Sequence, residues 1–294
     1  MNKESLIGIV TVLYNSESVI KDFFLSLATQ SYKNLILYIV DNKTPDDSIK
    51  ECRKYEKQLG FPVKYIQNDD NYGVAKGNNI GIKKALEDGC DYILLANNDI
   101  KLQSETINIL HKQLKEKEAL IAVPKIYFYN SNKLWYAGGK FCSFPKLCKH
   151  LYFLQEDVDG KFETPQFYDY APTCFMLISK LVFDKIGFMD EKYFCYYDDT
   201  DFMYRAKLNN INCYYCPKST IEHKESVSTG KWSDFHYYYL IRNRIYFIRK
   251  FKKSYKINYF FEIIYHCTLR FIKMINNQHQ WEVISKALKD SRNI

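Results

Sequence analysis

Apolar residues in the first 125 positions follow two alternating spacings, which predict strands and helices in turn. Five short apolar runs are rich in β-branched residues, as in strands buried on both faces: 6–13, 35–40, 63–66, 92–95 and 120–123. Four intervening segments repeat apolar positions at helical spacing: 16–27, 46–59, 74–86 and 106–117. Strands that alternate with helices indicate βαβ units. We therefore predict an α/β fold with a mostly parallel central sheet flanked by helices.

Polar side chains follow four of these predicted strands at the point where each strand ends. They are Tyr14-Asn15, Asp41-Asn42, Asn68 to Asn71, and Asn97 to Asp99. Ligands of parallel sheets bind in the crevice at the carboxyl ends of the strands. Asn and Asp also form turns, which would explain any one of these positions. All four together favour a binding site.

The second half of the chain has a different pattern. Residues 140–166 mix aromatic and charged residues, which predicts long loops. Further elements follow at 175–178 (strand), 180–186 (short helix), 198–208 (helix) and 211–216 (strand, which we expect Pro217 to end). From residue 233 to about 274 the spacing is largely helical, with aromatic and basic residues interleaved.

Three carboxylates, Asp198, Asp199 and Asp201, stand at the start of the predicted helix 198–208. Acids in a first turn can cap a helix and interact favourably with its dipole. Three acids exceed the needs of a cap. Crowding of like charges can raise the pKa of one carboxyl, which makes it a usable general base. This is the strongest local indication of chemistry in the sequence.

Candidate metal ligands occur at two places. Asp99 follows the strand 92–95, where a carboxylate could hold Mg²⁺ or Mn²⁺ between two phosphates, although an Asx turn would also explain it. His223 could join Asp99 only if the fold brings the two together; otherwise it is a surface histidine. Cys213 and Cys216 form a CxxC pair on a predicted strand, and we interpret them as small buried residues.

The segment from Asn71 to Gly81 is the nearest glycine-containing approach to a phosphate site in the sequence. It opens a predicted helix after a strand, so the helix N-terminus could face a phosphate. Neither GxxxxGK[ST] nor GxGxxG occurs in the sequence.

Composition limits the number of domains and the class of protein. The chain has 294 residues, 47% hydrophobic and 26% charged, which fits one large domain or two small ones and excludes a disordered protein. The net charge is +8. Residues 231–294 hold 13 basic and 4 acidic residues, whereas the other 230 residues hold 29 basic and 30 acidic residues. All the excess positive charge therefore lies in this C-terminal region.

The C-terminal region admits three interpretations. In residues 237–253, Ile241, Ile245 and Ile248 share one helical face beside Arg242 and Arg249, as in a helix that seeks an anionic membrane surface. The same face could instead pack on the sheet. Aromatic residues interleaved with basic ones also suit single-stranded nucleic acid, which we rank third.

No stretch has the length and hydropathy of a membrane span, and the first residues lack a signal-peptide pattern. The nine cysteines are an odd, scattered set, typical of reduced thiols. We therefore expect a cytoplasmic protein that is peripheral on the inner face of the cell membrane.

Taken as an ordered set, the motifs resemble those of family 2 glycosyltransferases of the GT-A (Rossmann-like) fold, especially the bacterial rhamnosyltransferase-like branch. The matching segments span about residues 6–250: 10–15, 39–42, 71–81, 94–99, 137–139, 187–191, 196–205, His223 and 242–243. The resemblance implies a catalytic domain at 1–230, with a nucleotide-binding half at about 1–125 and an acceptor-side half at about 126–230. Residues 231–294 would form a helical, basic extension.

The resemblance also implies roles for single residues. Asp199 matches the general base. Asp99 and His223 match the ligands of a divalent cation, Mn²⁺ or Mg²⁺. Positions expected to bind the nucleotide-sugar are Thr11, Tyr14, Asp41, Asn71, Asn78, Asn97 and Asp99.

The sequence departs from the family pattern at three places. Asn97 replaces the first acid of the D-x-D motif, and Asp198 replaces the usual Glu. Residues 172–174, Pro-Thr-Cys, stand where small residues are common.

These roles imply an inverting hexosyltransferase that moves a sugar from dTDP-rhamnose or a UDP-sugar to a hydroxyl of a cell-surface glycan or lipid-linked saccharide. The alternative is an inactive relative that binds nucleic acid or membrane, which intact Asp99, Asp199 and His223 argue against. A nucleotidyltransferase is weaker still, because its paired-acid metal site would be spoiled by Asn97.

Overall fold

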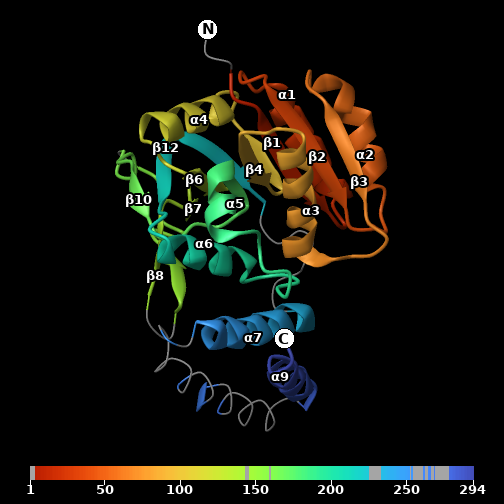
Figure 1. The fold of residues 1–294 in the computed structure, drawn as a ribbon, viewed down its shortest axis with the longest axis vertical. Helices are drawn as coiled ribbons and strands as arrows, with labels where there is room; N and C mark the ends of the chain where they lie inside the picture. Colours follow the sequence, from red (N-terminus) through yellow and green to blue (C-terminus); the bar gives the residue numbers. More distant parts are fainter. Residues whose placement is uncertain are drawn as a thin grey trace.

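The computed structural model describes residues 4–142, 146–158, 160–224, 233–251, 253, 261, 264–265, 268 and 278–294. Figure 1 shows a sheet of β-strands covered by helices, with α7 and α9 together at the end of the molecule away from the N-terminus. The helices are α1 (Glu17–Ala28), α2 (Ser48–Tyr55), the 3₁₀ helix Glu56–Gln58, α3 (Gly73–Glu87), α4 (Thr106–Glu116), α5 (Lys180–Ile186), α6 (Asp198–Leu208), α7 (Asp234–Lys250) and α9 (Gln278–Asp290). The strands are β1 (Ile7–Leu13), β2 (Leu35–Asp41), β3 (Val63–Gln67), β4 (Tyr92–Ala96), β5 (Ile100–Leu102), β6 (Ile121–Phe128), β7 (Leu134–Tyr136), β8 (Gly139–Phe141), β9 (Cys148–His150), β10 (Gln166–Tyr168), β11 (Phe175–Ser179) and β12 (Cys213–His223).

The main sheet has the strand order β10-β12-β6-β11-β4-β1-β2-β3. The strands β3, β2, β1 and β4 are parallel, as the βαβ pattern predicts. Strand β11 then runs antiparallel between β4 and β6, and β12 is parallel to β6. The α/β fold is therefore confirmed, with a parallel first half and a mixed second half. Strand β11 was predicted at 175–178, but its antiparallel direction was not, because periodicity within a single strand carries no signal of strand direction.

Helix α3 packs unusually close to β1, and its glycines explain why. A Cβ on Gly77 would lie 2.9 Å from a methyl of Val12, and one on Gly81 would lie 2.4 Å from a methyl of Val10. Both contacts are shorter than van der Waals distance. The glycines at 77 and 81 therefore serve helix–strand packing.

Strand β12 corrects one prediction. We expected Pro217 to end a strand at 216, but the strand continues to His223. The register against β6 shifts between Cys216 and Thr220, and this irregularity accommodates a residue without an N–H. Cys213 and Cys216 are both buried with free thiols, which confirms their interpretation as small core residues.

The predicted loop region also contains short strands. Segment 140–166 includes the end of β8, all of β9, and the first residue of β10, while the rest is irregular. Lys125, buried in β6, donates to Asp157 Oδ2 at 2.7 Å and also to Glu163, which ties this region to the sheet.

The apolar face of α7 is covered by the protein itself. Ile241 and Ile245 pack with Ile284 and Ala287 of α9. Ile248 belongs to the main core. The packing interpretation expected this face to lie on the sheet, whereas the structure covers it mainly with α9. The basic positions that follow it lie mostly between 252 and 277, largely outside the described residues. Among the helices that the structure describes, none combines the length and hydropathy needed to cross a bilayer.

Candidate active site

A cleft of about 920 Å³ opens at the carboxyl ends of β1 and β4. Its walls come from these strand ends, the start of α3, the residues that lead into α6, the end of β12 and the first turns of α7. Seven of the residues predicted from the sequence line it: Tyr14, Asn71, Asn78, Asn97, Asp99, Asp199 and His223. The fold thus brings the strand ends together as expected.

Asp99 and His223 meet in this cleft, although they come from distant parts of the chain. Strands β12 and β5 pair His223 with Ile100, next to Asp99. Asp99 Oδ1 lies 3.1 Å from His223 Nε2. Burial raises the pKa of the Asp99 carboxyl, but the His223 imidazole outweighs this and holds the pKa below its usual value. His223 is only 5% exposed, which excludes the alternative interpretation of it as a surface histidine.

The polar atoms of this pair fit a divalent cation. Asp99 Oδ1, His223 Nδ1 and His223 Nε2 are buried and make no hydrogen bond with acceptable geometry. Buried polar atoms without partners are uncommon in folded proteins. A carboxylate oxygen and an imidazole nitrogen are suitable ligands for Mn²⁺ or Mg²⁺. Among the residues described, no group of three or more His, Cys, Asp or Glu side chains could hold a metal, so this pair alone supplies the candidate ligands of those types.

Asp198 and Asp199 open α6 and also line the cleft. Asp199 Oδ2 accepts a hydrogen bond from the Tyr170 hydroxyl at 3.0 Å. Its Oδ1 accepts from the backbone N–H of Thr200 at 2.6 Å and from the Thr200 hydroxyl at 3.1 Å. Burial raises the pKa of Asp199 above its usual value, although Tyr170 and Thr200 counteract the shift. Burial, together with the neighbouring Asp199 charge, also raises the pKa of Asp198.

Comparison with known proteins now decides the family. The sequence model of Glycosyl transferase family 2 matches residues 8–187, more than half of the chain. The chain belongs to glycosyl transferase family 2. It is 26% identical over 240 residues to the low-salt glycan biosynthesis hexosyltransferase Agl10 of Haloferax volcanii, covering 81% of this chain and 74% of that protein. It is 28% identical over 250 residues to the dTDP-rhamnosyl transferase RfbF of Shigella flexneri, covering 82% and 79%.

Solved structures support the fold. The structure of GalNAc-T7 with UDP, GalNAc and Mn²⁺ matches with a TM-score of 0.65 at 14% identity, over 84% of this chain and 50% of that one. A structure of Staphylococcus aureus TarS 1-349 with UDP-GlcNAc matches with a TM-score of 0.55 at 19% identity, over 83% and 66%. This chain thus spans half to two thirds of the length of these two neighbours. The expected GT-A fold is confirmed.

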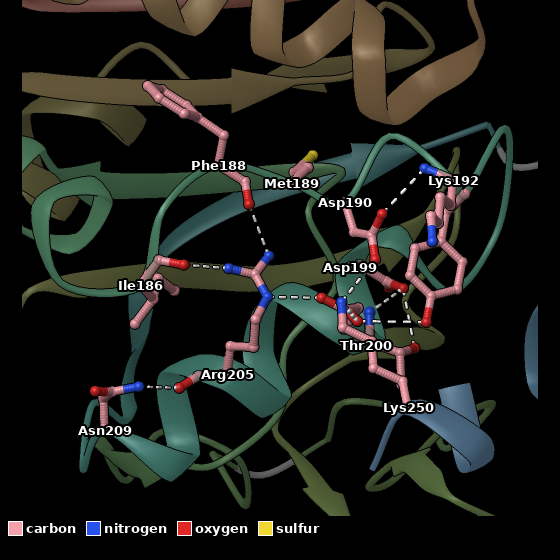
Figure 2. A network of polar contacts seen from close by, with 12 residues as sticks. Ile186, Phe188, Met189, Asp190, Lys192, Asp199, Thr200, Arg205, Asn209 and Lys250 are labelled. Carbon is pink, nitrogen blue, oxygen red and sulfur yellow. Dashed lines mark hydrogen bonds and ion pairs between the residues drawn. The ribbon is translucent and has the colours of Figure 1, made fainter. Parts of the chain in front are cut away.

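Asp201, the third acid of the cluster at 198–201 in this family 2 chain, makes structural contacts. Asp201 accepts from Arg205 Nε at 2.7 Å and from Lys250 Nζ at 2.6 Å. Figure 2 shows the Arg205 guanidinium reaching the carbonyl oxygens of Ile186 and Phe188, and Lys250 lying beside Asp190. Sequence pattern alone could not separate Asp201 from Asp199, because both stand in the same helical turn.

Two predicted nucleotide contacts do not line the cleft. Thr11 is 1% exposed, and by strand alternation its side chain lies on the opposite face of β1 from Val10 and Val12, which pack on α3. Asp41 is also buried, and its Oδ1 accepts from the N–H of Thr44 at 2.9 Å. Their role in nucleotide binding stays a prediction.

Asn42 is a residue of the cleft that was not among the predicted site residues. Its side-chain amide donates to Gly73 O at 3.0 Å and to Asn71 Oδ1 at 3.3 Å, and its Oδ1 accepts from Asn68 at 2.8 Å. It therefore joins the ends of β2 and β3 to the start of α3. The sequence placed it in the matching segment 39–42 and among the polar strand ends, but turn residues share that place and it received no role.

The start of α3 does not present open amides to a phosphate. The N–H of Gly73 donates to Asn71 Oδ1 at 3.0 Å, and the N–H of Val74 donates to Phe194 O at 2.7 Å. The protein itself satisfies both groups. The structure thus gives no support to a phosphate site on the amides of Gly73 and Val74.

Proposed function

We propose that this protein is an inverting hexosyltransferase that transfers a sugar from dTDP-rhamnose or a UDP-sugar to a hydroxyl of a cell-surface glycan or lipid-linked saccharide. The observation that carries the proposal is that one cleft holds both the Asp99–His223 pair and the half-buried carboxylate of Asp199. Inverting transfer requires these two functions: charge stabilisation of a leaving diphosphate and one general base.

The donor would occupy the edge of the cleft formed by the strand ends. Tyr14, Asn71, Asn78 and Asn97 line this edge and are the proposed nucleotide-sugar contacts. The similarity to a dTDP-rhamnosyl transferase supports dTDP-rhamnose as a donor. The neighbours solved with UDP or UDP-GlcNAc support a UDP-sugar.

Asp99 and His223 would hold the cation, Mn²⁺ or Mg²⁺, with their Oδ1 and Nε2 atoms, which lie 3.1 Å apart. A bound cation would supply positive charge beside the donor diphosphate. Asn97 contributes no charge, so Asp99 is the single acidic ligand from this strand end.

Asp199 is the proposed base. As the acceptor oxygen forms its bond to the anomeric carbon, the bond from that carbon to the diphosphate oxygen breaks on the opposite face. The hydroxyl proton passes to the Asp199 carboxylate, and the bonding electrons leave with the nucleoside diphosphate. Because the pKa of Asp199 is raised, it lies closer to the operating pH, which favours proton transfer to the carboxylate.

The first test compares Asp199→Asn with Asp184→Asn, a matched change at an exposed position of α5. We expect Asp199→Asn to bind nucleoside diphosphate like the wild type but to lose transfer by about 10²–10⁴-fold, the usual contribution of a general base. Asp184→Asn should retain full activity. Undiminished turnover by Asp199→Asn would refute the assignment of the base.

A second test identifies the donor by calorimetric titration with UDP, dTDP and GDP, each with Mn²⁺ and with EDTA. We expect metal-dependent binding of one nucleotide, and loss of the metal dependence in Asp99→Asn. If no nucleotide binds, the result favours the alternative, an inactive relative, over a transferase. Steeply salt-dependent affinity for single-stranded nucleic acid would then favour a binding module.

A further inference from the structure

We propose that Asn243, on α7, is a positioning residue that fixes the backbone from which the proposed base Asp199 projects. This inference rests on the proposed function. It assigns to the C-terminal region a part in the active site, beyond the residues 8–187 that the family model matches.

The backbone that precedes Asp199 is held in an unfavourable conformation. Tyr196 and Tyr197 are consecutive residues with φ angles of 65° and 68°. This left-handed region is costly for residues that carry a Cβ, and it persists only where the surroundings enforce it. Tyr197 is the N-cap residue of α6, and its carbonyl accepts from the N–H of Asp201 at 2.9 Å. The direction in which α6 starts therefore depends on these two tyrosines.

Asn243 makes the contacts that enforce this conformation. It is fully buried, and its side-chain amide donates to Cys195 O at 2.7 Å and to Tyr196 O at 2.9 Å. Its Oδ1 accepts from Arg242 Nε at 2.8 Å, which orients the amide. Arg242 in turn donates to Lys192 O at 2.6 Å. The side-chain amide thus donates both of its hydrogen bonds to two successive carbonyls of the strained segment.

The same segment is held from the other side by α3. The carbonyl of Phe194 accepts from the N–H of Val74, and Gly73 leaves room for this approach because a Cβ there would lie 2.2 Å from Phe194 O. Residues 194–197 are therefore clamped between α3 and α7. Lys250 of α7 adds a contact beyond the clamp, to Asp201.

The experiment compares Asn243→Ala with Ile245→Ala. Ile245 lies on the same helix, is also buried, and packs toward α9 rather than toward residues 194–197. Ile245→Ala therefore controls for general loosening of α7. Asn243→Asp is a second variant that keeps the volume and the acceptor for Arg242 but donates no hydrogen bond to the two carbonyls. All variants are made in the full chain.

The first readout is amide hydrogen exchange, which needs no activity. We expect exchange in the peptide covering residues 194–201 to accelerate at least tenfold in both Asn243 variants, with β1 to β4 unchanged. The second readout is transfer kinetics, in which kcat should fall at least tenfold with nucleotide affinity unchanged. Ile245→Ala should show neither effect.

Two results would overturn the proposal: unchanged exchange at 194–201 in the Asn243 variants, or equal acceleration in Ile245→Ala. Because exchange is measured without substrate, the role of Asn243 in holding the segment is tested even if the wild type transfers no sugar. A wild type without transfer would instead refute the proposed function.

Discussion

The hydroxyl of Tyr170 controls the charge of the proposed base, because it donates to Asp199 Oδ2 and favours the ionised carboxylate. Removing it in Tyr170→Phe should raise the pKa of Asp199 further. Since a general base works only when ionised, the acid limb of the kcat/KM profile should move to higher pH, by about one unit for a lost hydrogen bond to a charged group. The measurement is kcat/KM against pH. Tyr168→Phe, on the neighbouring β10, is the control and should leave the limb unmoved, and an unmoved limb in Tyr170→Phe would contradict the prediction.

His111 couples protein stability to pH. It is buried between the rings of Tyr32 and Tyr92, and burial lowers its pKa to about 4. The unfolded chain, with a pKa near 6.5, therefore binds the proton more readily than the folded protein. This contribution to stability is complete above about pH 6.5 and is lost as the pH falls toward 4.

We expect the free energy of unfolding to decrease more steeply from pH 7 to 4.5 in the wild type than in His111→Phe, by up to about 3 kcal/mol. Urea unfolding of both proteins across this range measures the difference. Parallel pH dependences of the two proteins would show that His111 does not contribute.

Among the elements, α3 depends on Gly73 at its first residue. Gly73 has a φ of 75°, and an added Cβ would also meet Phe194 O at 2.2 Å. Gly60 has a similar φ of 68° but open space around it. Gly60→Ala should cost about 1–2 kcal/mol from the backbone alone, and Gly73→Ala should cost more, because the clamp on residues 194–197 must shift. Chemical denaturation of both variants measures this, and equal costs would mean that the contact with Phe194 is easily relaxed.

The elements also show how far the sequence could be interpreted. Helix α6 was predicted with its observed bounds, and β1 and β4 within one residue at each end. These elements are predictable because the pattern of apolar residues that indicates them lies within the segment itself. Strand β12 was predicted too short, since its pairing with β6 tolerates Pro217 through a register shift that no local pattern reveals.

The site was only partly predictable for a related reason. Asp99 and Asp199 stood out through their own motifs, whereas Asn42, Tyr170 and Asn243 act through contacts made after folding. Tyr170 looked like an ordinary residue of its segment, and Asn243 belonged to a matching segment, 242–243, that carried no assigned role. The buried place of His223 depended on β12 extending past Pro217, which the sequence argued against.

At the scale of the whole molecule, positive charge is unevenly distributed, and residues 231–294 hold the entire positive excess. Since α7 buries its apolar face, a membrane contact would rest on the charges that follow it. We predict that changing Lys252, Lys253 and Lys256 to Glu weakens co-sedimentation with anionic vesicles by roughly 100-fold, at about 1 kcal/mol for each lysine.

The matched control places the same three changes at Lys50, Lys112 and Lys185, which are exposed on the body of the protein. It should bind vesicles like the wild type. Equal loss in both triple variants would indicate a response to net charge alone, and no loss in either would exclude a membrane contact through these lysines.

Because the clamp on residues 194–197 includes α7, it also affects the order in which the parts of the cleft are completed during synthesis. The strands β3, β2, β1, β4, β11 and β6 adjoin one another and are complete by Ser179, and the chain leaves the ribosome with its N-terminus first. His223 and Asn243 are added later. Under the proposed roles, the strand ends that would bind the nucleotide are synthesised first. The Asp99–His223 pair requires β12, and the fixed position of Asp199 requires α7. A nascent chain would then be unable to consume nucleotide-sugar until the whole cleft exists.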